Sequence, residues 1–176
     1  MKAEVKIKEI TKGCMPFITE KGDWIDLRAA KEIKLEGFRA DTLKRHHKDE
    51  NNYRKVNFKW ELVPLGVAMQ LPPGYEAVVA PRSSTFKKWY TMEANSIGVI
   101  DNSYNGNTDE WHFPILMFED GVIHEGDRIC QFRIQLSQKA TLWQKIKWLF
   151  TSGIKLVQVD ELDNENRGGF GSTGVN

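Results

Sequence analysis

Apolar residues along this chain mostly alternate with polar ones or form short runs that Pro, Gly and Asn interrupt. Residues 1–10 alternate in this way and place Val5 and Ile7 on one face, as in a β-strand with one buried side. Between residues 58 and 136 turn signals recur every ~8–12 residues, which favours an antiparallel sandwich or barrel over alternating strands and helices. Further strands are predicted at residues 75–80, 111–118, 127–136 and 154–162.

Residues 141–151 follow a helical period instead. Their apolar residues form one stripe at helical spacing: Leu142, Trp143, Ile146, Leu149 and Phe150. Such a stripe predicts a helix that packs on the barrel and covers an open edge or end. The alternative is a helix that docks on a partner protein or lies on a membrane surface, because Lys145 and Lys147 flank a face rich in Trp.

Length and charge set limits on the class of protein. With 176 residues the chain has the size of one domain, and 25 basic against 24 acidic residues give a net charge of +1. Proteins that bind nucleic acid usually carry a strong basic excess, so no nucleic-acid partner is expected. An anionic ligand would therefore have to be bound by a few well-placed groups.

Cysteine usage and the chain ends suggest where the protein works. Cys14 and Cys130 lie far apart in the sequence and match neither a zinc spacing nor a disulfide framework. The first ten residues lack the apolar core of a secretory signal, and no run reaches the ~18 apolar residues of a membrane span. We expect a cytoplasmic protein with reduced thiols and no membrane partner.

Two further segments stand apart from the strand pattern. Residues 37–55 mix basic and acidic side chains and contain the pair His46-His47; an exposed loop or short helix is the favoured interpretation over a binding patch or a metal site. Residues 166–176 are rich in Gly. They could form a flexible tail, or an arm that orders over a phosphate-bearing ligand.

Three short stretches carry residues suited to a nucleotide. Pro81-Arg-Ser-Ser84 follows an apolar strand and offers a guanidinium with two hydroxyls, although such a sequence is more often a plain turn. Asp101 could activate a water and the Tyr104 ring could lie on a sugar, but both could also be ordinary turn and strand residues. Gln131 lies in a strand with Ile129 and Arg133 on the same face, where it could contact a ligand or serve as a satisfied structural amide.

Together these stretches match five motifs in a fixed order. They are Trp24 to Ala30, Ala80 to Ser84, Asn95 to Gly106, Gly126 to Gln131 and Gly168 to Gly174. In order and spacing the chain resembles the trimeric dUTP pyrophosphatases, or dUTPases. The resemblance implies an all-β fold, a distorted jelly-roll β-barrel with one added helix near residues 141–151. It also implies a homotrimer with active sites at the subunit interfaces.

The resemblance divides the chain and assigns its chemistry. It implies a barrel domain at residues 1–165 with insertions near 37–55 and 141–151, followed by a flexible arm at 166–176. The substrate would be dUTP and the cofactor Mg²⁺, with Asp101 deprotonating the water that attacks the α-phosphorus. Tyr104 would stack on deoxyribose, and Asp26 would act on the metal through a bound water.

The remaining positions would bind the substrate. Uracil would be read by the hairpin residues Asn95, Gly98, Val99 and Ile100. The triphosphate would be held by Arg82, Ser83, Ser84 and Gln131, with Arg167 as a further phosphate contact. The arm would close with Phe170 over the uracil ring and Gly171, Ser172 and Thr173 on the phosphates.

Two alternatives remain open. One is a dCTP deaminase, a type of enzyme that resembles a relative on the same fold but uses a Glu to move protons at the cytosine ring. Glu110 is the candidate for this Glu. A regulatory protein could keep the nucleotide site and act by docking a protein partner through residues 141–151.

Overall fold

The structure is a computed structural model that describes residues 1–38 and 59–169. These residues form thirteen strands and two helices. The strands are β1 (Ala3–Glu9), β2 (Phe17–Ile18), β3 (Ile25–Arg28), β4 (Ile33–Leu35), β5 (Trp60–Pro64), β6 (Val67–Gln70), β7 (Tyr75–Pro81), β8 (Thr91–Glu93), β9 (Gly98–Ile100), β10 (His112–Met117), β11 (Gly121–Ile123), β12 (Arg128–Leu136) and β13 (Ile154–Val159). The helices are α2 (Thr85–Trp89) and α3 (Leu142–Leu149).

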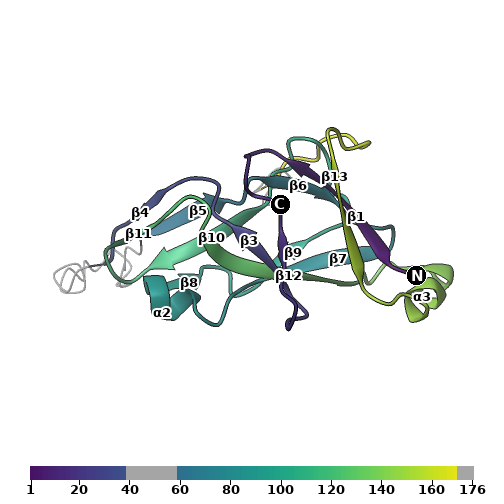
Figure 1. Cartoon of the computed structure of the whole chain (residues 1–176), viewed down its shortest axis with the longest axis horizontal. Helices are drawn as coiled ribbons and strands as arrows, with labels where there is room; N and C mark the ends of the chain where they lie inside the picture. Colours follow the sequence, from purple (N-terminus) through teal and green to yellow (C-terminus); the bar gives the residue numbers. More distant parts are fainter. Residues whose placement is uncertain (39–58, 170–176) are drawn as a thin grey trace, which may run out of the picture.

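The strands pair in four sheets. The largest has the order β2-β3-β12-β7-β9 and is antiparallel throughout. Two three-stranded sheets follow the orders β13-β1-β6 and β5-β10-β8, and β11 pairs with β4. Figure 1 shows the sheets as the body of an elongated molecule, with α3 beside the N-terminus at one end and α2 toward the other. The predicted all-β class is confirmed.

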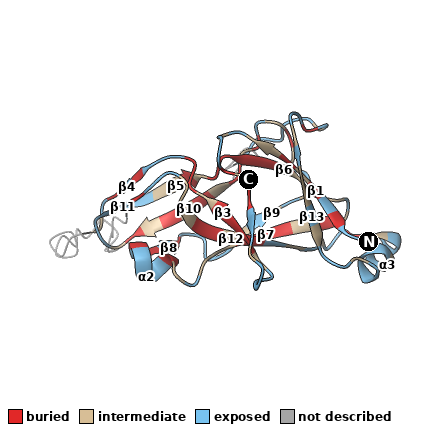
Figure 2. Cartoon of the chain, in the orientation of Figure 1, coloured by how far each residue is buried: buried red, intermediate tan, exposed pale blue. Residues whose placement is uncertain are grey.

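Buried side chains from all four sheets join in one hydrophobic core. Val5 and Ile7 are fully buried, as the alternation in the first strand predicts. Near the centre Trp111 packs edge-on against Phe132, with 5.3 Å between the ring centroids. Figure 2 shows the buried positions along the strands and exposed ones over the two helices. The sheets therefore close around a shared interior, as in a barrel.

Most predicted strands lie within two residues of the observed ones. β7, β10 and β12 match the prediction at that precision, whereas β13 ends at Val159, before the predicted 162. The expected alternation in β12 is wrong at its start. The pairing with β3 shifts register between Arg128 and Cys130, and this bulge places both Ile129 and Cys130 inside the core.

The predicted helix is present as α3, but its predicted packing is wrong. Thr141 and Gln144 form a capping box at its start, which accounts for where the helix begins. None of its residues is buried, and the apolar stripe faces away from the barrel. Gln144, on the polar side, lies against Gly74 instead.

The short helix α2 was not predicted, since residues 81–84 suggested only a turn. The insertion near 37–55 lies, from residue 39 on, outside the described residues.

Candidate active site

Three strands of the large sheet bring together residues that are far apart in the sequence. Gln131 on β12 lies opposite Asp26 on β3 and opposite Ala80 on β7. Arg82 follows directly after β7 at the same end of the sheet. Parts of the first, second and fourth motifs thus form one row across adjacent strands.

Asp26 is the buried centre of this row, with 3% of its surface exposed. Its Oδ1 forms an ion pair with Arg82 Nε at 2.8 Å, and its Oδ2 accepts a hydrogen bond from Arg128 Nη1 at 3.1 Å. Arg82 Nη1 also donates to the Arg128 carbonyl oxygen at 3.1 Å. Gln131 Nε2 donates to the Pro81 carbonyl oxygen at 3.2 Å. Both guanidinium groups are therefore held in fixed orientations and remain partly exposed to a ligand.

Thr85 fixes the turn after β7 through two hydrogen bonds. The buried Thr85 hydroxyl accepts the Arg82 N–H at 3.0 Å and donates to the Ile129 carbonyl oxygen at 2.6 Å. Ser84 is the N-cap residue of α2 but makes no side-chain capping bond, and Ser83 is exposed. Because Thr85 carries the structural bonds of the turn, the two serine hydroxyls are not needed for them and can serve a ligand. Sequence reasoning missed Thr85 and Arg128, although both adjoin motif residues.

A second group of predicted residues lies at the other end of β7. Here β9 pairs with β7, so that Ile100 lies opposite Ala77, and Asp101 follows at the end of the strand. The Tyr104 N–H donates to the Asp101 carbonyl oxygen at 3.0 Å, and the Tyr104 hydroxyl donates to the Glu110 carbonyl oxygen at 2.8 Å. Burial, together with the charges of Asp109 and Glu110, raises the pKa of Tyr104 to about 12. The Tyr104 hydroxyl is thus protonated, and its ring is held in one position near Asp101.

Asp101 faces the start of the C-terminal segment. Its Oδ2 lies 3.0 Å from Arg167 Nη1 in an ion pair, and 58% of the Asp101 side chain is exposed. Arg167 is placed by its backbone: the Arg167 N–H donates to both Asp109 oxygens, at 2.9 and 3.1 Å, and the Gly168 N–H donates to Asp109 Oδ1 at 3.0 Å. Asp109 therefore positions the arginine that contacts Asp101, a function that sequence reasoning missed.

The environment of Asp109 explains its charge. Burial alone raises the pKa of this carboxyl, but hydrogen bonds from backbone amides of Arg167, Gly106 and Gly168 outweigh it, so the pKa lies below the usual value of 3.8. Asp109 is 1% exposed and still ionised at neutral pH. A negative charge fixed at this point holds the backbone of the segment that begins the fifth motif.

Behind the Gly98 end of β9 lies a second buried acid, Glu93 on β8. It is 6% exposed, and neither carboxylate oxygen has a hydrogen bond of normal geometry within the described parts of the chain. Burial raises the pKa of Glu93 to about 7, an effect that the Gly98 amide partly offsets. A Cβ added at Gly98 would come within 3.2 Å of Glu93 Oε1 and 3.1 Å of Val79 Cβ. The hairpin thus rests closely on this carboxyl, which nothing in the sequence pattern singles out.

The two groups of site residues do not meet within one chain. Asp101 follows the residue opposite Ala77, and Arg82 lies five residues further along, so that at ~3.4 Å per residue they are about 17–20 Å apart. A cleft of about 870 Å³ contains Asp101 and Arg167 but has neither Arg82 nor Gln131 on its walls. Asn95 and Val99 are exposed near the hairpin.

Other candidates are settled by their contacts or lie outside the described residues. Glu110 is half-buried and accepts the Gly66 N–H at 2.9 Å, as a structural residue does. The described residues contain no group of three His, Cys, Asp or Glu side chains that could hold a metal ion. The structure does not describe these predicted residues: His46, His47, Phe170, Gly171, Ser172 and Thr173.

The chain is similar to known proteins of one family. The dUTPase family model matches residues 51–174. The SPbeta prophage-derived deoxyuridine 5′-triphosphate nucleotidohydrolase YosS of Bacillus subtilis is 46% identical over 156 residues, which cover 89% of this chain and 87% of that protein.

Two solved structures share the fold. The dUTPase of phage phi11 of S. aureus, described as coordinating a structural Mg(II) ion, has a TM-score of 0.58 at 17% identity and covers 78% of this chain and 94% of its own. The dUTPase of Streptococcus mutans has a TM-score of 0.57 at 20% identity and covers 74% and 91%. The sheets described above are therefore those of the jelly-roll dUTPase fold, and the chain belongs to the dUTPase family.

Proposed function

We propose that this protein hydrolyses dUTP to dUMP and pyrophosphate. The observation that carries the proposal is the placement of motif residues in a chain of the dUTPase family: Asp101 and Tyr104 on one hairpin, and Arg82 with Gln131 beside a buried Asp26. An ionisable acid, an aromatic ring and a row of phosphate ligands are the parts that such a reaction requires.

The reaction begins at Asp101. Its carboxylate accepts a proton from a water, whose oxygen forms a bond to the α-phosphorus while the bond from that phosphorus to the bridging oxygen of the β-phosphate breaks. Pyrophosphate then leaves. The exposed Asp101 side chain can reach a water, and the paired Arg167 can move to the phosphates once nucleotide binds.

Base and sugar are recognised next to this carboxylate. The Tyr104 ring stacks on deoxyribose and leaves no space for a 2′-hydroxyl. Backbone groups of Gly98, Val99 and Ile100 hydrogen-bond to uracil, with Asn95 close by. The hydrogen bond from Tyr104 to the Glu110 carbonyl oxygen fixes the ring in this position.

The phosphates bind at the other group. Arg82 supplies a fork of donors that Asp26 holds in place, and Ser83, Ser84 and Gln131 supply hydroxyl and amide donors. Residues 170–173 complete this set, with Phe170 over the base and Gly171, Ser172 and Thr173 on the phosphates. Few positive groups suffice because they act at short range on a small polyanion.

Mg²⁺ fits these residues as an ion that arrives with the nucleotide. Protein sites usually hold Mg²⁺ through one or two carboxylates, waters and substrate phosphates. Each Asp26 oxygen contacts one guanidinium group, which leaves lone pairs for a metal-bound water. When bound, the ion would neutralise charge on the phosphate oxygens.

The separation of the two groups supports a homotrimer with shared sites. A triphosphate cannot bridge residues that lie about 17–20 Å apart on one strand of the same chain. A neighbouring subunit that brings its Arg82 and Gln131 to this subunit's Asp101 would complete the site. Each interface of a closed ring would then hold one complete site.

The test is pyrophosphate release from each deoxynucleoside triphosphate in the presence of Mg²⁺. The wild type should act on dUTP alone. Asp101→Asn should lower turnover by about 10²–10⁴-fold while nucleotide still binds, because the substitution removes only the group that accepts the proton from water. Asp160→Asn, at an exposed acid, is the matched control and should retain full turnover.

Wild-type turnover in Asp101→Asn would remove this residue from the mechanism. Ammonia release from dCTP without pyrophosphate release from dUTP would instead identify a deaminase of the same family of folds.

A further inference from the structure

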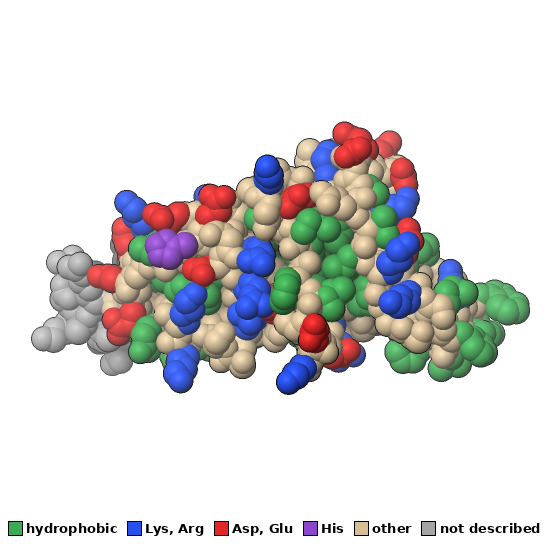
Figure 3. Space-filling model, viewed as in Figure 1, with side chains coloured by type: hydrophobic (Ala, Val, Ile, Leu, Met, Phe, Trp, Pro, Cys, Tyr) green, Lys and Arg blue, Asp and Glu red, His purple; other side chains and the backbone are tan. Residues whose placement is uncertain are grey.

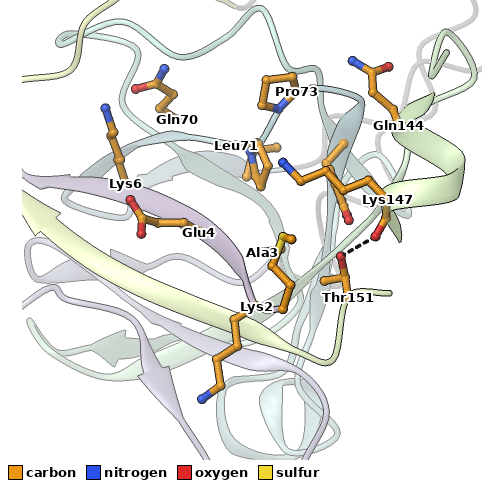
Figure 4. Close-up of a pocket in the computed structure, with 13 residues that line it drawn as sticks. Lys2, Ala3, Glu4, Lys6, Gln70, Leu71, Pro73, Gln144, Lys147 and Thr151 are labelled. Carbon is orange, nitrogen blue, oxygen red and sulfur yellow. Dashed lines mark hydrogen bonds between the residues drawn. The ribbon is translucent and has the colours of Figure 1, made fainter. Parts of the chain in front are cut away.

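Helix α3 rests on the barrel through its polar side. Figure 4 shows Gln144, Lys147 and Thr151 along a pocket of about 320 Å³, whose other walls include Ala3 and Glu4 of β1. Gln144 also lies against Gly74, as described above. The side of the helix opposite the apolar stripe therefore faces the protein, and Trp148 lies on this side too, where it lines a second pocket with Ala3 and Tyr75.

The apolar stripe is turned outward as a result. Leu142, Trp143, Leu149 and Phe150 are 71%, 78%, 72% and 72% exposed. Figure 3 shows hydrophobic side chains gathered at this end of the molecule, where they project beyond the barrel. Single exposed apolar residues are ordinary, but a contiguous stripe of large ones marks an interaction surface.

The charge around the stripe has one sign. Residues 137–159 contain four lysines and no Asp or Glu, in a chain whose acidic and basic residues are otherwise balanced. At about 100° per residue, Lys145 and Lys147 fall on either side of the stripe. They and Lys139 make no ion pair with any described residue, and the amino terminus lies at the same end, donating to the Phe150 carbonyl oxygen at 3.1 Å.

These observations identify the occupant by its chemistry. An apolar stripe with Trp and a border of unpaired lysines is the arrangement of helices that lie in the interface of an anionic bilayer. A second copy of this chain docked stripe against stripe would instead bring together two surfaces of the same charge. The described residues include no helix long and apolar enough to cross a membrane, so the contact would lie on the surface.

We propose that α3 binds anionic lipid surfaces, with its apolar stripe between the lipid headgroups and its lysines at the level of the phosphates. From the sequence we expect no membrane partner, because no segment can span a bilayer, and a helix on a membrane surface is only the alternative interpretation of residues 141–151. The outward orientation of α3 overrides that expectation, since a surface helix needs only an exposed stripe and cationic borders.

The experiment is co-sedimentation of the full chain with vesicles of phosphatidylglycerol and phosphatidylcholine, or of phosphatidylcholine alone, at low and high salt. The wild type should bind the anionic vesicles, and salt should weaken the binding. The double variant Trp143→Ser/Phe150→Ser should bind the anionic vesicles with an affinity at least about tenfold lower than that of the wild type. Trp60→Ser/Met92→Ser removes two exposed apolar residues elsewhere, 62% and 50% exposed, and should bind as the wild type does.

Several results would overturn the proposal. They are the absence of wild-type binding to anionic vesicles, equal binding by the stripe variant, and a change of oligomeric mass in the stripe variant during sedimentation. A change of oligomeric mass in the stripe variant would mean that a second copy of the chain covers the stripe. Absence of wild-type binding to anionic vesicles would mean that the stripe docks in a protein groove with an acidic rim. Pyrophosphate release should be the same in both double variants, because neither touches the Asp101 cleft, so the outcome is independent of the proposed reaction.

Discussion

Asp109 and Glu93 are both almost completely buried acids near the segment from Gly98 to Gly106, yet their surroundings are opposite. Asp109 accepts hydrogen bonds from three backbone amides, those of Gly106, Arg167 and Gly168. Glu93 has no such bond with the described residues. The pKa of Asp109 is accordingly lowered and that of Glu93 raised to about 7, although burial raises both. Partners, and not depth, decide whether a buried carboxyl is charged.

The difference assigns each acid a different effect on the site. The charge on Asp109 holds Arg167, and through Arg167 it orients the proposed base Asp101. Glu93 lies under the Gly98 end of the hairpin and is neutral or charged according to pH. One acid thus fixes a segment, and the other makes the stability of its hairpin depend on pH.

Replacing Asp109 should have the largest effect. Asp109→Ala leaves three backbone amides without their charged acceptor, and bonds to charged groups contribute ~1.5–3 kcal/mol each, so the free energy of unfolding should fall by about 5 kcal/mol or more. Urea denaturation at pH 7 measures this loss, with Asp160→Ala at an exposed acid as the control. Because the pKa of Asp109 is lowered, its contribution is present above pH 3.8 and is lost as the pH falls through the native value. An unfolding free energy within ~1 kcal/mol of the wild type would show that the amides find other partners.

Removing the Glu93 charge should have the next largest effect, and it depends on pH. A carboxyl whose pKa rises from 4.5 to about 7 on folding binds more protons in the native state, so stability falls as the pH rises between these values. At 1.36 kcal/mol per unit, the wild type should lose about 3 kcal/mol between pH 4.5 and 7 and little above that range. Denaturation at several pH values should show this slope in the wild type and its loss in Glu93→Gln.

Glu119→Gln, at an exposed acid, is the matched control for the slope and should keep it. A wild type with equal stability at pH 5 and pH 8 would mean that Glu93 has an unseen partner.

The contrast also shows what the sequence could and could not predict. The strands that carry Gln131 and Ala80 are predicted from the sequence pattern, whereas Asp26 is linked to them only by the motif order, because no strand is predicted at residues 25–28. Glu93 is different because its strand is only three residues long and carries a charge. Its burial results from pairing with β10, a contact between residues far apart in the sequence. The helical period likewise predicts the stripe of α3 but not the side of the helix that faces the barrel.

The smallest effect separates charge from position. Asn166 lies next to Arg167, and its Oδ1 accepts the Thr108 N–H at 2.7 Å, so it holds the same junction as Asp109 with an uncharged and exposed acceptor. Asn166→Ala should cost only about 1 kcal/mol, the usual contribution of a neutral hydrogen bond, and the cost should be the same at pH 4 and pH 7. Urea denaturation of this variant and of Asp109→Ala at both pH values gives the comparison directly. Equal destabilisation of the two variants at pH 7 would mean that the stability of the junction depends on the number of hydrogen bonds and not on the charge of Asp109. The proposed difference between the two buried acids would then lose its basis.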